Sequence, residues 1–244
     1  MNPNELKQII ANSLGDFYKR RIQRLGTLKL RSVLQRKNPY LYKALGTNSA
    51  TEIVEEILRA YLSASDEGLF GDVFFEPVAK AVSKGVVSPT EGVDIAIETS
   101  DRYTAIAVKS GPNPYNSSQV KRQTDEFASL RRRLLKLRKQ FDPVLGHCYG
   151  KKQSLPNARR AYRDSSGQQF WEELTGDSDF YLKLIRFMEE EVIVKHRAEY
   201  QKDYQNAVNS YVREFTNQFC REDGSINWEK LVEFNSGKSV KKKK

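Results

Sequence analysis

The chain has 244 residues, of which 41 are Lys or Arg and 31 are Asp or Glu, giving a formal net charge of +10. This length is enough for one large domain or two small ones with a full core. A mean hydropathy of −0.66 and the lack of any apolar run near ~18 residues argue against a membrane protein. The first residues contain no basic segment followed by an apolar one, so no signal peptide is predicted. We therefore expect a soluble, cytoplasmic protein.

Cysteine and histidine are scarce. Cys148 and Cys220 are the two cysteines, and the chain has two histidines, His147 and His196. Two cysteines fit a reducing compartment and give no disulfide framework. So few ligands argue against a zinc site, and we assign no catalytic role to either histidine or to Cys148.

The N-terminal third is predicted to be helical. Residues 4–37 have apolar side chains at helical spacing, and Asn38-Pro39 marks a break. Ser49 followed by Glu52 is a capping-box pattern that predicts a helix from there to about Ser63. A further helical stretch runs from Asp72 to Val82, and Pro77 indicates that it begins or kinks near Glu76.

Two short apolar segments follow, and each carries one charged residue. They are residues 92–97, which include Asp94, and residues 105–111, which include Lys109. Residues 99–102 are short enough for a hairpin turn, so the spacing predicts two antiparallel neighbouring strands. Alternation places Ile106 and Val108 toward the core and puts Ala105, Ala107 and Lys109 on the opposite face.

The rest of the chain is predicted to alternate between helix, strand and loop. A long helix is expected over residues 118–140, with a buried stripe of Phe127, Leu130, Leu134, Leu137 and Phe141. We expect a strand over 144–149, a basic loop over 151–164, and helices over 168–188 and 189–219. Phe170 and Trp171 are interpreted as core residues.

Positive charge is concentrated in one part of the chain. Residues 119–163 contain thirteen Lys and Arg but three Asp and Glu, so this segment alone carries a net charge of +10. Such a field indicates a polyanion, most simply nucleic acid, although a solvated helix face has the same pattern. The candidate DNA-binding residues are Ser110, Gln119, Lys121, Arg122, Lys151, Lys152, Arg159 and Arg160. For Gln119 the alternative is a cap on the long helix.

Asp94 and Lys109 have the chemistry that phosphodiester hydrolysis requires. Mg²⁺ prefers carboxylate and carbonyl oxygens, which Asp94 and the backbone of Val108 can supply. Lys109 can orient a water molecule or stabilise the transition state. One carboxylate would hold Mg²⁺ weakly, so a second acid is needed. The alternative is an ordinary structural ion pair between Asp94 and Lys109.

The segment Asp94…Ala107-Val108-Lys109 resembles the core of PD-(D/E)xK nucleases. In that superfamily an Asp opens the second core strand and an acid-x-Lys pattern lies on the third, so Ala107 occupies the place of the second acid. The resemblance implies that another carboxylate replaces it. Glu76 matches the Glu that many members carry on a preceding helix, and Glu91 and Glu56 are the alternatives.

A narrower resemblance covers most of the chain. The segments YLSASDE (61–67), KSGPN (109–113), NSSQ (116–119), GHCYGK (146–151) and GQQFWEELTGD (167–177) resemble type II restriction endonucleases of the PmeII-like kind. This resemblance implies Mg²⁺-dependent cleavage of double-stranded DNA at a short recognition sequence, with 5′-phosphate products, usually by a homodimer. It also implies Asp94, Glu76 and Lys109 as catalytic residues, with Asp94, Glu76 and Val108 at the metal.

We therefore expect an α/β protein with a restriction-endonuclease-like core, in which a small mixed sheet is flanked by helices and has helical additions at both ends. Residues 1–244 would form a single nuclease domain. It would consist of a helical N-terminal region (1–48), a catalytic core (49–150), and a basic loop with a helical C-terminal region (151–244). A repair or recombination nuclease with the same core and a catalytically inactive DNA-binding protein are the alternatives.

Overall fold

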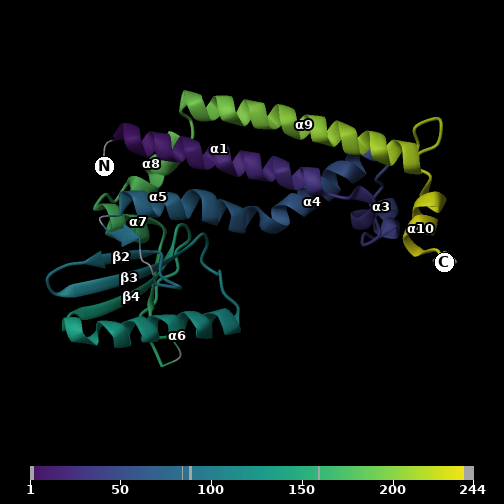
Figure 1. The fold of residues 1–244 in the computed structure, drawn as a ribbon. Coiled ribbons are helices and arrows are strands. Elements are labelled where there is room, and N and C mark those ends of the chain that lie inside the picture. The colour runs from purple at the N-terminus through teal and green to yellow at the C-terminus, as the bar shows by residue number, and fades with distance from the viewer. Residues whose placement is uncertain (1–2, 84, 88–89, 159, 239–244) are drawn as a thin grey trace, which may run out of the picture. The chain divides into compact units, whose positions relative to one another are not determined.

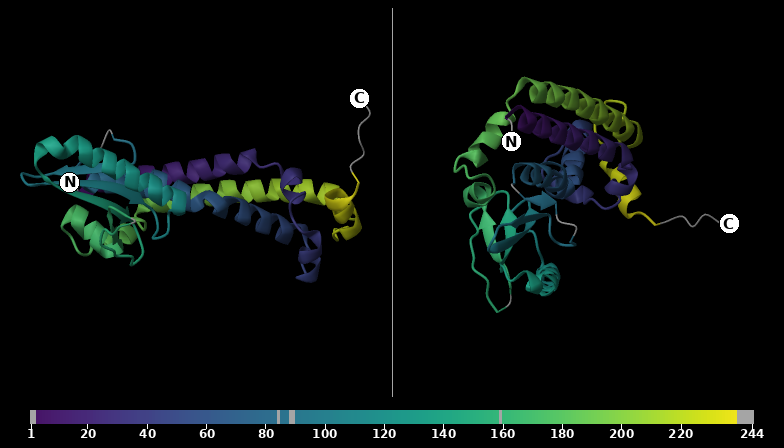
Figure 2. Two further views of the ribbon diagram at one scale, coloured as in Figure 1. Left: turned by 90° about the horizontal axis from the view of Figure 1, so that it is seen from below. Right: turned by 60° about the vertical axis from the view of Figure 1, so that its left-hand side comes forward.

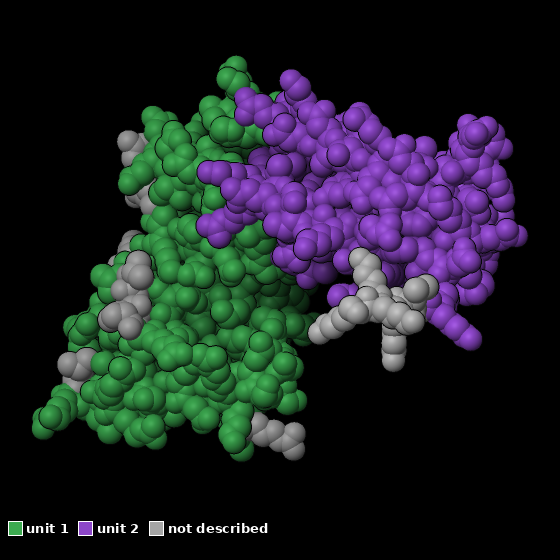
Figure 3. Space-filling model, turned by 45° about the vertical axis from the view of Figure 1, so that its right-hand side comes forward, with its two compact units in different colours: residues 1–17, 67–196 green, residues 18–66, 197–244 purple. Residues whose placement is uncertain are grey.

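The computed structural model describes residues 3–83, 85–87, 90–158 and 160–238. The chain forms two compact units, each assembled from segments that are distant in sequence. Unit 1 comprises residues 1–17 and 67–196, and unit 2 comprises residues 18–66 and 197–244 (Figure 3). The division into the three sequence regions 1–48, 49–150 and 151–244 stays a prediction.

Unit 1 contains a mixed β-sheet (Figure 1). Its strands lie in the order of the sequence: β1 (Val86–Val87), β2 (Ile95–Glu98), β3 (Arg102–Lys109), β4 (Gln140–His147) and β5 (Arg163–Ser166). Strands β1 to β3 pair antiparallel, and β3 to β5 pair parallel. The predicted hairpin is confirmed, since Ile95 pairs with Ile106 and the amide of Thr99 donates to the carbonyl of Arg102 at 2.9 Å.

Helix α6 (Ser117–Leu134) covers one face of the sheet. Phe127 and Leu130 on this helix pack against Ala105 and Ala107 of β3, which are almost completely buried. The face of Ala105 and Ala107 was predicted to lie opposite the core, and the structure shows that this face is also buried. Because helices cover both faces of the sheet, the alternation of apolar residues along β3 could not identify a solvent-facing side.

Helices α5 (Glu76–Val82) and α7 (Gly167–Thr175) contact the sheet at β3 and at β4 and β5 respectively. Figure 2 shows α6 and α7 on opposite faces of the sheet. The approach of α7 is close, because a Cβ at Gly146 of β4 would lie 2.2 Å from Cε2 of Phe170. The sheet is therefore sandwiched between helices, which confirms the expected α/β class.

The predicted helix over 118–140 is too long at its C-terminal end. Helix α6 stops at Leu134, a 3₁₀ turn covers Leu135–Leu137, and Arg138 takes a left-handed conformation with φ of 54°. Strand β4 then begins at Gln140, so Phe141 lies in a strand rather than on the helix. The apolar residue at 141 continues the helical spacing by coincidence, which is why periodicity alone missed the turn.

Three helical segments that precede the sheet in sequence form one continuous run. Helix α4 (Ala50–Phe70) leads into a π-helical segment (Gly71–Phe75) and then into α5. The predicted capping box is confirmed, because Ser49 Oγ accepts from the amide of Glu52 at 3.2 Å and Glu52 Oε2 accepts from the amide of Ser49 at 3.4 Å. Pro77 lies in the first turn of α5, as the sequence indicated.

Unit 2 is helical. It is built from the C-terminal part of α1 (Pro3–Thr27), from α2 (Leu30–Leu34), α3 (Pro39–Ala44) and α10 (Trp228–Ser236), and from parts of α4 and α9 (Glu191–Phe219). Its core includes Ile53, Ile57, Leu58, Phe215 and Phe219. The terminal parts of the chain are thus helical, as expected from the sequence. Among the described residues, no helix has both the length and the apolar character needed to cross a membrane.

Two C-terminal predictions need correction. The predicted helix over 168–188 is two helices, α7 and α8 (Phe180–Phe187), because Gly176 ends α7 in a left-handed conformation with φ of 75°. The last two residues of the predicted basic loop over 151–164 belong to β5, which begins at Arg163. Both errors come from short elements that carry too little periodicity to be recognised.

Candidate functional site

A cavity of about 750 Å³ lies in unit 1 where strand β3 ends. It is lined by residues 67, 68, 71, 72 and 76 of the α4–α5 run, by residues 108–115 after and at the end of β3, and by Gln119 and Tyr149. Five residues singled out in the sequence line this one cavity: Glu76, Val108, Lys109, Ser110 and Gln119. The cavity is therefore the candidate functional site.

Asp94 contacts this cavity wall through Val108. The amide of Val108 donates to Oδ2 of Asp94 at 2.7 Å. The next carbonyl, that of Lys109, accepts from the amide of Cys148 on the β4 side at 2.9 Å. Successive carbonyls of a strand point in opposite directions, so the carbonyl of Val108 points to the β2 side, like its own amide. The carboxylate of Asp94 and the carbonyl of Val108 are thus on the same side of β3.

Three charged groups, burial and one hydrogen bond influence the ionisation of Asp94. Burial of the half-buried carboxyl is the largest influence and raises its pKa above the ordinary value, whereas the hydrogen bond from Val108 lowers it. The charge of Glu76 raises the pKa further, and the charges of Lys109 and Lys80 lower it. Asp94, Glu76 and Lys109 are therefore near enough to interact electrostatically, and the net effect favours the protonated acid.

Glu76 lies on the helix face that lines the cavity. The cavity-lining residues of this run are at positions 67, 68, 71, 72 and 76. They repeat at intervals of four residues, so their side chains share one face of the run. Glu76 is also paired with Lys80, one turn along α5.

The other two candidate acids are in different surroundings. Glu91 is exposed and forms an ion pair with Arg122 at 2.5 Å. Glu56 lies in unit 2, where its charge adds to the effect of burial in raising the pKa of Tyr42 to about 12. Of the three alternatives drawn from the sequence, Glu76 is the one that lines the cavity.

Ala107 is 1% exposed and packs in an apolar cluster with Phe127, Leu130, Leu145 and Tyr162. A carboxylate at this position would have to displace that packing. Helix α6 packs over position 107 and leaves room for the small alanine side chain there. A second acid at the site would therefore have to come from another element.

Tyrosines and a glutamate position the residues around Lys109. Lys109 Nζ lies 5.9 Å from the ring centroid of Tyr115, whose hydroxyl donates to Gln123 at 2.6 Å. Burial raises the pKa of Tyr115, so its hydroxyl stays neutral. On the other side, Glu67 accepts from Ser110 Oγ at 2.5 Å and from the hydroxyl of Tyr149 at 2.9 Å.

Sequence reasoning missed Glu67, Tyr115 and Tyr149 as cavity residues. Glu67 lies one helical turn before Gly71, so the face that leads to Glu76 was detectable as a spacing. The sequence was predicted to form separate helices up to about Ser63 and from Asp72, and so a spacing that crosses both was not considered. Nothing local distinguishes Tyr115 or Tyr149 from other tyrosines of the chain.

The predicted DNA-binding residues differ in their surroundings. Lys121 and Lys151 are exposed, whereas Arg122 pairs with Glu91 and Glu126. Lys152 donates to the carbonyl of Pro112 at 3.0 Å, and Arg160 pairs with Asp164 at 2.7 Å. Gln119 completes the capping box of α6 with Asn116. Arg159 lies outside the described residues. Contacts of these side chains with DNA stay predictions.

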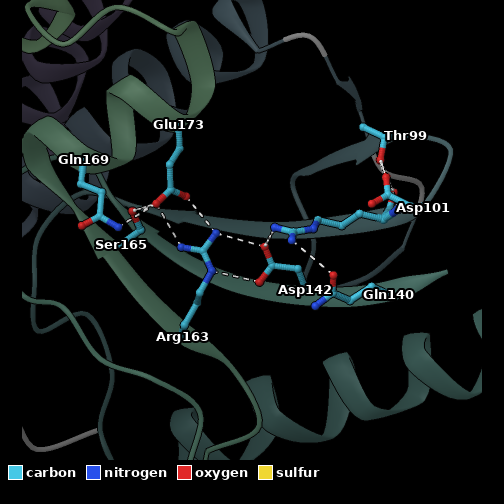
Figure 4. Close-up of polar contacts among 9 residues, drawn as sticks. Thr99, Asp101, Gln140, Asp142, Arg163, Ser165, Gln169 and Glu173 are labelled. Carbon is cyan, nitrogen blue, oxygen red and sulfur yellow. Dashed lines mark hydrogen bonds and ion pairs between the residues drawn. The ribbon is translucent and has the colours of Figure 1, made fainter.

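Part of the basic segment is neutralised within the protein. Arg163 lies between Asp142, 2.9 Å away, and Glu173, also 2.9 Å away (Figure 4). Ser165 and Gln169 donate to the same carboxylate of Glu173. The net charge of this segment therefore overstates the positive field that it presents to a ligand.

The remaining singled-out residues are structural. Phe170 and Trp171 are 1% exposed, as predicted, and the indole of Trp171 donates to the carbonyl of Cys148 at 2.8 Å. Burial raises the pKa of the Cys148 thiol well above its ordinary value, which disfavours the thiolate that a nucleophile requires.

The donor set fits magnesium better than zinc. Within the part of the chain that the structure describes, no three His, Cys, Asp or Glu side chains cluster tightly enough to hold a metal ion. The predicted metal ligands, Asp94, Glu76 and the carbonyl of Val108, all offer oxygen atoms, and their role at a metal stays a prediction. Mg²⁺ accepts such a set because it keeps several of its water ligands.

A mixed sheet sandwiched between helices, with carboxyls and a lysine at one cavity, is an arrangement suited to a nuclease of the α/β class. The family model for the type II restriction endonuclease EcoO109I matches residues 4–196. The chain belongs to this family of type II restriction endonucleases, whose members are hydrolases that act on double-stranded DNA. No curated protein matches the chain.

Proposed function

We propose that this chain is a site-specific type II deoxyribonuclease with a PD-(D/E)xK type of active site. It would hydrolyse phosphodiester bonds of double-stranded DNA in a Mg²⁺-dependent reaction that leaves 5′-phosphates, and it would act as a homodimer. The family membership supports the general activity. The observation that carries the site assignment is the interaction of Asp94 with Val108, Glu76 and Lys109 at one cavity wall.

Each residue has a defined task in this proposal. Asp94 and Glu76 would hold the cation, together with the carbonyl of Val108. Mg²⁺ bound there would supply an activated water and neutralise charge on the phosphate. The ammonium of Lys109 would donate to the attacking water or to a phosphate oxygen, where it stabilises the negative charge that grows in the transition state. The stacked Tyr115 ring restricts the directions that this ammonium can take.

Ser110 and Gln119 line the same cavity and would contact the DNA backbone near the cleaved bond. The exposed Lys121 and Lys151 would contact more distant phosphates, with Arg122, Lys152, Arg159 and Arg160 as further candidates. Phosphate contacts of this kind set the position of the protein on DNA without reading its sequence.

The test is digestion of a phage DNA by the purified protein with Mg²⁺. We expect discrete fragments with ligatable 5′-phosphate ends from the wild type and none from Asp94→Ala. A wild-type protein that yields no discrete fragments would overturn the proposed function. Undiminished cleavage by Asp94→Ala would overturn the site. Random nicking would instead favour a repair or recombination nuclease with the same core.

The buried Ala107 supports a second candidate, a DNA-binding protein of this family that has lost catalysis. This candidate predicts tight binding to duplex DNA with Mg²⁺ or Mn²⁺ present and no cleavage at any enzyme concentration. The same digestion, run beside a gel-shift measurement, separates the two candidates.

A further inference from the structure

A buried carboxylate outside the candidate site connects several positively charged side chains. Asp164 of β5 has a side chain that is 0% exposed. It accepts from Nε2 of His147 at 2.8 Å and from Nη1 of Arg160 at 2.7 Å, and also from the hydroxyl of Ser154. Nζ of Lys152 lies 3.6 Å away. One carboxylate thus balances up to three cations.

Asp164 is ionised in the folded protein. Burial opposes ionisation, but the hydrogen bonds from His147 and Ser154 and the charges of Arg160 and Lys152 outweigh it and lower the pKa of Asp164 to about 2. The cluster therefore has a permanent negative centre at neutral pH, and its cationic partners are held in place by it.

Two of these partners reach the cavity wall. Nδ1 of His147 lies 2.8 Å from the carbonyl of Gly111, and Lys152 donates to the carbonyl of Pro112 at 3.0 Å. Both nitrogens of the buried His147 ring are thus engaged, one with Asp164 and the other with the carbonyl of Gly111, so the ring connects the carboxylate to this wall. Gly111 and Pro112 directly follow Lys109 and Ser110 and line the cavity.

The same wall is closely packed at Gly111 and beside Gly150. A Cβ at Gly111 would lie 2.4 Å from the hydroxyl of Tyr149, and a Cβ at Gly150 would lie 3.1 Å from Cβ of Pro112. Two hydrogen bonds and two close contacts therefore restrain the main chain within three residues of Lys109. All of these groups belong to unit 1.

We propose that Asp164 is a positioning residue for the cleavage reaction, acting through His147 and Lys152 on the wall formed by residues 110–114. This inference depends on the proposed function, because it assigns Asp164 to the site at Lys109. The carboxylate anchors the His147 ring and the Lys152 ammonium, whose other contacts are with Gly111 and Pro112. A neutral amide at 164 would weaken both attachments, because it carries no charge.

The variant that tests this is Asp164→Asn, and the matched control is Asp142→Asn. Asp142 lies on the neighbouring strand β4 and is also largely buried and paired with an arginine, Arg163, but that pair contacts Glu173 rather than the cavity wall (Figure 4). Both variants remove one carboxylate charge from the same pair of strands, so a general loss of stability affects both.

Two measurements are needed, and one of them does not depend on cleavage. Hydrogen–deuterium exchange follows the peptide that contains residues 109–115. Single-turnover cleavage of phage DNA at saturating protein, beside the DNA affinity measured in EDTA, separates positioning from binding. For Asp164→Asn we expect faster exchange in this peptide and a cleavage rate lower by about 100-fold, with little change in affinity. For Asp142→Asn we expect wild-type values.

Unchanged exchange in Asp164→Asn would overturn the link to the wall, even if cleavage is slow. If Asp142→Asn shows the same loss of cleavage rate and the same increase in exchange as Asp164→Asn, the role of Asp164 is structural only, and the proposal is overturned. If Asp164→Asn fails to fold, Lys152→Met is measured by exchange alone, and a wild-type exchange rate in residues 109–115 would count against the proposal. A wild-type protein without nuclease activity would overturn the proposed function and this role together. The exchange result would still show whether Asp164 restrains residues 110–114.

Discussion

The amide of Val108 donates a 2.7 Å hydrogen bond to Oδ2 of Asp94, so the residue before Lys109 is attached directly to the carboxylate that precedes β2. This bond fixes the relative position of the acid and the lysine on two antiparallel strands. An asparagine at 94 can accept the same hydrogen bond through its Oδ1 atom. The geometry of the site and its charge can therefore be separated by experiment.

We expect Asp94→Asn to be more stable than the wild type at neutral pH without metal. Folding raises the pKa of Asp94, mainly through burial, so the folded state binds this proton more tightly than the unfolded state. The free energy of unfolding then falls as pH rises from the ordinary value of 3.8 through the raised one. Thermal melting at pH 7 measures the difference, which should vanish below pH 3.8, where both states are protonated.

Magnesium should reverse the order of the melting temperatures of the wild type and Asp94→Asn. A cation bound at Asp94 stabilises the ionised carboxylate and binds the folded state alone, so Mg²⁺ should raise the melting temperature of the wild type. The same addition should have a much smaller effect on Asp94→Asn. A variant that melts below the wild type at pH 7 without metal would contradict the assignment of a strained acid at this position.

Glu76→Gln should abolish cleavage, whereas Glu91→Gln should digest phage DNA at the wild-type rate. Glu76 lines the cavity and influences the ionisation of Asp94. Glu91 is exposed and paired with Arg122. Time courses of digestion with equal protein and Mg²⁺ measure the difference. If Glu76→Gln stays active and Glu67→Gln does not, the replacing acid is Glu67, which lines the same cavity.

The sequence predicted the hairpin between β2 and β3 and the α/β class because Asp94, Lys109 and the apolar runs lie close together along the chain. It predicted Glu76 from a resemblance rather than from spacing, because the helical segments on either side of residues 64–71 were not recognised as one run. The contact of His147 with Asp164 was beyond sequence reasoning, because the two residues meet only through the parallel pairing of β4 with β5. Parallel pairing leaves no local signal in the sequence.

Ala107→Glu, which restores the acid of the superfamily pattern, should destabilise the protein. Position 107 is 1% exposed and packs against α6. Overfilling such a core costs about 1–3 kcal/mol, and burial of an unpaired carboxylate adds to this cost. Thermal melting measures it, and Ala64→Glu, on the exposed face of α4, is the control that should melt close to the wild type. If Ala107→Glu melts like the wild type and cleaves faster, position 107 faces the metal instead of the core.

Replacement of the exposed Lys121 and Lys151 by alanine should weaken DNA binding in a salt-dependent way. Each phosphate contact releases condensed counterions, so the slope of log affinity against log salt should fall by about 0.9 for each lysine removed. Fluorescence anisotropy with a labelled duplex in EDTA measures the slope without cleavage. Lys183→Ala is the control, because Lys183 lies on α8 and is paired with Asp177. Its slope should equal that of the wild type. A loss of affinity with an unchanged slope in the Lys121 and Lys151 variants would mean that these lysines act on the fold rather than on DNA phosphates.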